Sequence, residues 1–331
     1  MVDNKPGRLV WFNGDFVPEN EARVSIYDSA LMFGDMVFEM TRSFNGKQFK
    51  LREHIERLYA GVKILRVPIT MTMDEMEKAV NETIEANQPA FEPDDEHRIL
   101  IDVSRGLLGL YHDVVGLDKG PNVIIADFPL RWTVVGMGRL FDGHINGVLV
   151  GQRAVPGTLI DPKIKNRSRI HYLMANIEAG QMEGEDNWPI LLDPDGFVAE
   201  GSGNNVFLAK NGKLFTPEGR NILRGISRNY VIEELCPQLG IEIEERNLEA
   251  YDLYTADEIF VTSTPMCMLP FVKFNSTPVG TGKVGPMFTR ILNQWSENTG
   301  VDIPGQIKKW NAARVAKPSA PTPYRFKQKA S

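Results

Sequence analysis

The sequence predicts an α+β protein with two domains. Its 331 residues are more than one core of ordinary size needs, and they suit two. Hairpin signals alternate with amphipathic helices in the first part, and strands joined by tight turns dominate the second. We expect a smaller α+β domain over residues 1–130, a glycine-containing linker or loop over 131–147 and a larger domain over 148–303.

The elements expected in the first domain follow apolar patterns of period two or close to 3.6. They are hairpins at Asn13-Gly14 and Asn45-Gly46, helices with apolar faces at 55–62 and 76–84, and strands at 98–104 and 122–128.

The second domain is expected to contain short strands, tight turns and two long helices. They are a strand at 148–150, turns at 193–196 and 211–212, a helix at 226–239, strands at 241–243 and 259–262, and a helix at 288–295. The stretch 304–331 contains no acid, seven lysines and arginines and several prolines. We therefore expect a basic tail that is flexible or lies along a partner.

Composition narrows the function classes. A net charge of −6 argues against nucleic acid or an anionic membrane as the main partner. Two cysteines and five scattered histidines make neither a disulfide framework nor a metal-ligand motif, so no metal is expected. No run is apolar enough for a membrane span or a signal peptide, which favours a cytoplasmic protein.

Lys165 is the residue around which a functional interpretation can be built. It follows a loop punctuated by Pro162 and precedes a predicted helix. A lysine held beside a core can lose affinity for its proton and act as a nucleophile toward aldehydes, whereas most lysines are ordinary surface residues. The predicted helix has a helical rhythm of apolar residues and should bury the face formed by Ile170, Leu173, Met174 and Ile177.

Three further patterns suit a phosphate or a flat ring, although each also has an ordinary structural interpretation. Arg57 on an amphipathic helix offers a fork to a phosphate, but such arginines are more often surface ion-pair partners. Gly225 before Ile226 and Ser227 puts free N–H groups at a helix start, where an anion is favoured. Thr264 at a strand end could add a hydroxyl, or could simply be a polar exit from the strand.

The fourth pattern is an acid followed by small residues, Glu200-Gly201-Ser202-Gly203. Small residues let backbone approach a flat ligand closely. A carboxylate facing a pyridine nitrogen keeps that nitrogen protonated, which makes the ring a strong electron acceptor. An amine, an anion cradle and such an acid together match pyridoxal 5'-phosphate.

In order and wording, the sequence resembles the fold-type IV aminotransferases, which include branched-chain, D-amino-acid and (R)-amine transaminases and aminodeoxychorismate lyase. The resemblance covers nearly the whole chain. Its marks are 33–39 (FGDMVFE), Arg52-Glu53-His54 with Arg57, Lys165 with the helix running to Glu178-Ala179, 200–205 (EGSGNN) and 224–227 (RGIS).

The resemblance implies a two-domain enzyme whose larger C-terminal domain has a β-barrel-like sheet. It implies that Lys165 binds the aldehyde of pyridoxal 5'-phosphate and later moves the substrate proton, with Lys163 as the competing lysine. Glu200 would face the pyridine nitrogen. The partners would be an amino acid or amine donor and a keto acid acceptor, and the assembly a homodimer. The phosphate would be held by Arg57, Ile226, Ser227 and Thr264.

Substrate residues are less clearly marked. Phe33 and Phe38, with Leu110 and Met266, would form an apolar wall favouring hydrophobic substrates. Branched-chain enzymes carry a tyrosine where this chain has Phe33, and Pro265 lacks the N–H that many members offer. A lyase of the same family and a non-catalytic α/β protein remain alternatives. The candidates for the substrate carboxylate are Arg98, Arg105, Tyr111, His112 and Arg131.

Overall fold

The computed structural model describes residues 7–113, 116 and 119–314. The chain forms two compact units. The first unit comprises residues 1–133 and 164–168, and the second comprises residues 134–163 and 169–331. Among the described residues, no helix is long and apolar enough to cross a membrane.

The first unit contains the predicted hairpins, helices and strands. At the first hairpin turn, Asn13 and Gly14 have φ of 51° and 107°, the left-handed values that this turn requires. The elements are β1 Leu9–Phe12, β2 Asp15–Pro18, α1 Ser29–Phe33, β3 Met36–Met40, β4 Ser43–Phe44, β5 Lys47–Gln48, α2 Leu51–Leu65, α3 Met73–Asn87, η1 Gln88–Ala90, β6 His97–Ser104, η2 Gly109–Tyr111 and β7 Asn122–Pro129, with α4 Arg131–Val134 at its boundary.

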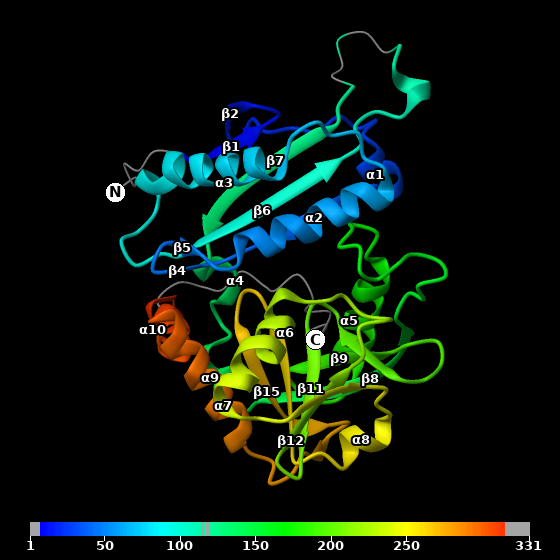
Figure 1. Ribbon diagram of the computed structural model, residues 1–331, viewed down its shortest axis with the longest axis vertical. Coiled ribbons are helices and arrows are strands. Elements are labelled where there is room, and N and C mark those ends of the chain that lie inside the picture. Colours follow the sequence, from blue (N-terminus) through cyan, green and yellow to red (C-terminus); the bar gives the residue numbers. More distant parts are fainter. Residues whose placement is uncertain (1–6, 114–115, 117–118, 315–331) are drawn as a thin grey trace, which may run out of the picture. The chain divides into compact units, whose positions relative to one another are not determined.

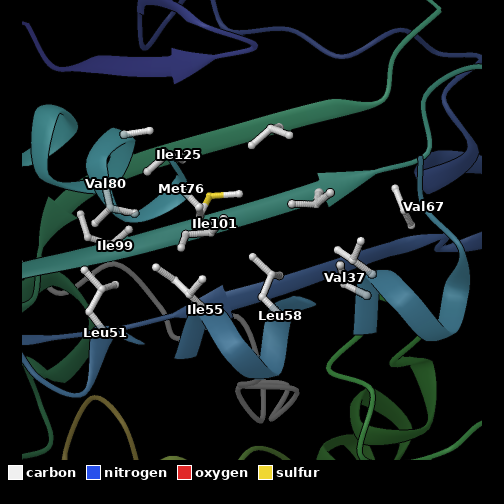
Figure 2. Packing of buried hydrophobic residues seen from close by; sticks show 14 of the residues in the cluster. Val37, Leu51, Ile55, Leu58, Val67, Met76, Val80, Ile99, Ile101 and Ile125 are labelled. Carbon is white, nitrogen blue, oxygen red and sulfur yellow. The ribbon is translucent and has the colours of Figure 1, made fainter. Parts of the chain in front are cut away.

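An antiparallel sheet in the order β2-β1-β7-β6-β3 carries this unit, and α2 and α3 lie along it (Figure 1). Figure 2 shows Ile55 of α2 and Met76 of α3 packed around Ile99 and Ile101 of β6. Side chains alternate along a strand, so the even-numbered residues of β6 face away from the helices. The helix-free face of the sheet therefore carries Arg98 and Asp102.

The second unit is built on a closed ring of six strands in the order β10-β9-β8-β15-β14-β11, because β11 pairs back to β10. This agrees with the expected barrel-like sheet. The elements are η3 Gly138–Asp142, β8 Ile145–Arg153, α5 Ile170–Gln181, β9 Asn187–Leu192, β10 Val198–Gly201, β11 Asn205–Lys210, β12 Lys213–Pro217, α6 Ile226–Tyr230, η4 Val231–Leu235, α7 Cys236–Leu239, β13 Ile243–Arg246, α8 Ala250–Tyr254, β14 Glu258–Ser263, β15 Cys267–Phe274, β16 Thr277–Pro278, α9 Pro286–Thr299 and α10 Ile303–Arg314.

The helix after Lys165 is present as α5, but the predicted buried face is wrong. Ile170 and Met174 are 68% and 48% exposed, whereas Ala175 and Ala179 are buried. Alanines allow α5 to pack closely on β8 and β9, in a cluster that includes Leu191. Large apolar residues misled the prediction, because this interface is made by small ones.

Two stretches have more structure than composition indicated. Residues 131–147, expected as a linker or loop, contain α4, η3 and the start of β8. At the start of the expected tail, α10 buries Ile303, Ile307 and Trp310. The spacing of these three residues is helical, and prolines farther along the chain concealed it. Residues 315–331, the rest of the expected tail, lie outside the described residues.

Candidate active site

Lys165 lies in an extended segment of the first unit. The N–H of Phe38 donates to the Lys165 carbonyl over 2.9 Å, and the N–H of Arg167 donates to the Met36 carbonyl over 3.0 Å. Ile164, 6% exposed, anchors the segment in the core. Lys165 is therefore placed by backbone pairing with the edge strand β3, and α5 begins only at Ile170. Sequence reasoning gave Lys165 a loop and missed this pairing.

Two cationic side chains lie over the ring of Phe38. Lys165 Nζ is 4.8 Å from the ring centroid and Arg167 Cζ is 3.8 Å from it. Residues two apart in an extended segment project to the same side, which explains why both reach one ring. Arg167 also pairs with Asp102 over 2.7 Å. Burial raises the pKa of Asp102, and Arg167 opposes that rise.

Arg57 is oriented by a carboxylate that the sequence prediction had not given a role. Its Nε and Nη2 donate to the two oxygens of Glu39 over 2.6 and 2.8 Å. His54 Nδ1 lies 2.7 Å from Glu39 Oε2. Burial opposes ionisation of Glu39, yet Arg57 and His54 hold its pKa well below the usual range.

His54 is the neutral member of this group. Burial lowers its pKa, more strongly than the neighbouring Glu39 raises it. The signals for this group were present in the sequence. His54 and Arg57 are three residues apart on one helix, so they share a face, and Glu39 belongs to the 33–39 motif.

Arg98 is a buried cation among apolar neighbours. It is 8% exposed, its Nη2 lies 3.3 Å from the sulfur of Met40, and its Cζ lies 5.8 Å from the Phe128 centroid. Its Nε and Nη1 have no hydrogen-bond partner in the described part of the chain. Burial and the nearby Arg42 lower the pKa of Arg98 to about 10, so it stays charged at neutral pH.

The other substrate candidates differ in surroundings. Tyr111 stacks on Tyr27 with centroids 4.7 Å apart, and His112 Nε2 lies 3.0 Å from the carbonyl oxygen of Leu107. Phe33 is 67% exposed at the end of α1. These residues have contacts that account for their positions without a ligand, or lie on the surface of the unit.

Arg105 and Arg131 are ion-paired. Arg105 Nε pairs with Asp35 over 2.6 Å. Arg131 pairs with Asp94 over 2.6 Å and also with Asp95. Both arginines therefore already neutralise acids of their own unit.

In the second unit, Glu200 lies in β10 and is 4% exposed. Tyr172 of α5 donates its hydroxyl to Oε1. The N–H of Leu223 donates to Oε2 over 3.1 Å, and Asn205 Nδ2 approaches Oε2 at 3.4 Å. Glu200 thus accepts from α5, from β11 and from the loop before α6, and hydrogen bonds to a carboxylate favour its ionised form.

Strand register groups polar side chains around this acid. Glu200 pairs with Asn205, and Asn205 pairs with Thr262. Directly opposed residues share a face of a sheet, so these three side chains lie in one row. The buried Thr262 hydroxyl has no hydrogen-bond partner among the described residues. The sequence prediction used Thr264, half-buried just after β14, and overlooked Thr262.

The predicted helix start is present. Ile226 opens α6, which continues through η4 and α7 to Leu239, and no side chain caps its first turn. Ser227 is buried. A Cβ at Gly225 would approach the Asn205 side-chain oxygen at 2.2 Å, so this position requires glycine. An uncapped first turn suits an anion, since its N–H groups lack helical acceptors.

Comparison with known proteins identifies close relatives. Residues 36–274 match the family described as amino-transferase class IV. A putative branched-chain-amino-acid aminotransferase of Methanocaldococcus jannaschii is 34% identical over 87% of this chain and 95% of its own length. The branched-chain-amino-acid aminotransferase of Escherichia coli K12 is 33% identical over 88% of this chain and 92% of its own.

The chain is also similar to solved structures of branched-chain aminotransferases. The branched-chain aminotransferase of Thermoproteus uzoniensis with norvaline superposes with a TM-score of 0.75 at 30% identity, covering 92% of this chain and 97% of that one. The branched-chain amino acid aminotransferase of Thermobaculum terrenum in its pyridoxal phosphate form gives 0.77 at 26% identity, covering 93% and 97%.

The described residues fit pyridoxal phosphate. In the second unit, a carboxylate held by three donors suits a ring nitrogen that carries a proton, and an uncapped helix start suits a phosphate. The unpartnered hydroxyl of Thr262 lies in the same row as the acid. In the first unit, Lys165 offers an amine beside an aromatic ring.

Proposed function

Since the chain belongs to the class IV aminotransferases and catalyses transamination with pyridoxal 5'-phosphate, we propose that its amino donor is a hydrophobic amino acid of the branched-chain type and its acceptor a 2-keto acid. The relatives named for branched-chain amino acids support this choice. The buried ring of Phe38 beside Lys165 makes the surroundings of the amine partly apolar.

We assign the cofactor contacts as the family resemblance implies. When bound, pyridoxal phosphate supplies an aldehyde for amines and a ring that accepts electrons. Lys165 would hold the cofactor at its aldehyde, and its Nζ would take the proton from the substrate Cα. Glu200 would accept a hydrogen bond from the protonated ring nitrogen. The phosphate would be held by Arg57, Ile226, Ser227 and Thr264.

Glu39 gives Arg57 a fixed direction in this assignment. Two of the three guanidinium nitrogens of Arg57 are held by the Glu39 carboxylate. A side chain fixed in this way loses less freedom when it binds a phosphate. His54 is neutral and does not compensate the charge of Glu39, so this carboxylate remains the counter-charge of Arg57.

Buried Arg98 is the observation that carries the choice of an amino acid over a simple amine. Two of its nitrogens lack partners within the described chain, which is costly for a buried cation. A substrate carboxylate would supply the missing acceptors, and guanidinium and carboxylate match in a two-bond geometry. A simple amine has no such group.

Half-reaction spectra test this function. The cofactor band of the purified enzyme should change within a single turnover with L-leucine, L-valine or L-isoleucine, and full turnover should require a 2-keto acid. D-alanine and (R)-phenylethylamine form the comparison panel. A response confined to D-amino acids or amines, or to glutamate and aspartate, would refute the proposed donor.

Arg98→Met should raise KM for both amino acid and keto acid roughly 10–100-fold, because hydrogen bonds to charged groups are worth that much. Arg131→Met is the matched control, since Arg131 is half-buried and already paired with Asp94 and Asp95. KM in the control should stay close to that of the unaltered enzyme. Equal effects of the two substitutions would remove Arg98 from the proposal.

We also propose a homodimer in the cytoplasm. On the first unit, Ile26, Leu31, Met32 and Phe33 are exposed apolar residues in and near α1. Several large apolar side chains exposed together on one element favour a protein partner. Light scattering of the purified protein should give twice the chain mass of 37.2 kDa. A monomer at micromolar concentration would contradict the assembly.

A further inference from the structure

Tyr172 contacts the proposed cofactor acid from a separate element. It is the third residue of α5, and its hydroxyl donates to Glu200 Oε1. Further donors to this carboxylate include the Leu223 N–H and the Asn205 amide, the latter at 3.4 Å. The tyrosine is therefore the side chain whose removal would change the acid most directly.

The orientation of Tyr172 is fixed on several sides. Arg169 Cζ lies 4.9 Å from the Tyr172 ring centroid, and Arg169 Nη2 donates to the Ser202 carbonyl over 3.2 Å. Asn176 Nδ2 donates to the Tyr172 carbonyl over 2.8 Å, and Ser202 donates its hydroxyl to Asn176 Oδ1 over 3.0 Å. The first turns of α5 and the segment after Glu200 thus hold one another at more than one point.

Tyr172 acts only as a donor toward Glu200. Burial, reinforced by the neighbouring carboxylate, raises the pKa of Tyr172 well above its usual value. The hydroxyl keeps its proton at any pH at which the enzyme would work. An ionised carboxylate can only accept, so the direction of this hydrogen bond is fixed.

We propose that Tyr172 is a positioning residue that keeps Glu200 ionised and aligned for the ring nitrogen of the cofactor. The proposal rests on the assignment of Glu200 made above. Each donor to a carboxylate lowers its affinity for a proton. A carboxylate and a ring nitrogen that share one proton compete for it. By weakening the proton affinity of Glu200, Tyr172 leaves the proton on the nitrogen, where it strengthens the electron-accepting ring.

Tyr172 lies close to Lys165 in the sequence. The helix that carries Tyr172 begins at Ile170, shortly after Lys165. The sequence prediction gave Tyr172 no role, because its contact with Glu200 joins residues that are distant in the chain.

A double-mutant cycle tests the proposal. Apoenzyme is prepared from the unaltered protein, Tyr172→Phe, Glu200→Gln and the double variant, and pyridoxal phosphate affinity is measured by fluorescence titration across pH. Tyr172→Phe removes one oxygen and keeps the ring, so its fold should survive, and thermal unfolding checks this. Tyr230→Phe is the control, because Tyr230 is also buried in this unit and its oxygen accepts from Asn298 over 2.8 Å.

Tyr172→Phe should weaken cofactor affinity about tenfold at neutral pH, the size expected for a hydrogen bond to a charged group. It should also move the acid-side loss of affinity about one pH unit upward, because Glu200 then takes up its proton more readily. In the Glu200→Gln background, Tyr172→Phe should change cofactor affinity much less. It should not shift the pH at which affinity is lost. Tyr230→Phe should leave both quantities unchanged.

Two failures are distinguishable. If Glu200→Gln leaves affinity and its pH dependence unchanged, the assignment of Glu200 falls, and this proposal falls with it. If Glu200→Gln has its effect but Tyr172→Phe has none, or acts equally in both backgrounds, only the role of Tyr172 is overturned. The role of Tyr172 is supported if Tyr172→Phe moves the acid-side loss of cofactor affinity and Tyr230→Phe does not. Loss of packing alone would not produce that shift.

Discussion

The two units of this enzyme orient their functional side chains by different means. In the first unit, charge is balanced by charge, as with Glu39 against Arg57, and Asp102 against Arg167. In the second unit, the acid Glu200 is held by neutral donors, a tyrosine hydroxyl, an amide and a backbone N–H. One arrangement depends on ionised partners, and the other depends on dipoles.

This difference has energetic consequences. Removing one partner of a buried ion pair strands a charge and typically costs about 3–5 kcal/mol. Removing one neutral donor from a carboxylate that has others costs about 1–3 kcal/mol. We therefore expect the first unit to respond to substitution and acid mainly through stability, and the second mainly through cofactor affinity.

Lys165→Ala should have the largest effect on activity. If its amine moves the substrate proton as proposed, this loss should reduce kcat by on the order of 10³-fold or more. Borohydride reduction of the loaded enzyme followed by peptide mapping should label position 165 in the unaltered protein and nothing in the variant. Lys163→Ala is the control, because Lys163 pairs with Asp161 over 2.8 Å. A label on Lys163 would reverse the assignment.

Glu39→Gln should have the largest effect on stability. It leaves Arg57 without its counter-charge inside the first unit, where Glu39 is fully buried. We expect the free energy of unfolding to fall by about 3–5 kcal/mol in urea titrations at pH 7. Glu53→Gln, which removes a half-exposed partner of Lys50, should change it by less than about 1 kcal/mol.

The pH dependence of this effect has a definite sign. The pKa of Glu39 is lowered in the folded protein, so its stabilisation is complete above the unfolded value of about 4.5 and is lost as pH falls below it. The stability gap between the unaltered protein and Glu39→Gln should therefore narrow between pH 5 and pH 3. A gap that stays constant over about those two units would mean that Glu39 is not the ionised member of this group.

Local patterns predicted the secondary structure well. The turns at Asn13-Gly14 and Asn211-Gly212 require left-handed φ values, which asparagine and glycine supply, and both occur where expected. The buried face of α5 was missed because alanines carry little hydrophobic signal. Pairing of residues 164–168 with β3 was missed because it joins distant segments, which no local period encodes.

Sequence patterns suggested site residues where a side chain has a recognisable chemical task. The assignments of Lys165, Glu200, Arg57 and the helix start at Ile226 remain predictions that the geometry suits. Residues acting through another residue, such as Glu39 and Tyr172, were not assigned, because their role depends on contacts across the fold. Arg98 could be proposed, but its burial and its unpartnered nitrogens appear only in three dimensions.

Asn205 offers the smallest but most selective test of the comparison between the units. Asn205 Nδ2 approaches Glu200 and also donates to the Leu223 carbonyl over 2.9 Å. Asn205→Ala removes a neutral donor and should weaken cofactor affinity by about 1–2 kcal/mol in fluorescence titrations. Asn205→Asp keeps the size of the side chain but places a second carboxylate beside Glu200.

The charged variant should weaken cofactor affinity more than alanine does, and its loss should shrink as pH is lowered toward about 5, where the paired acids share a proton. Stability of the first unit should not follow this change, because its ion pairs involve none of these residues. If alanine and aspartate have equal effects, Asn205 acts through packing alone, and the contrast between charge in one unit and neutral donors in the other loses this support.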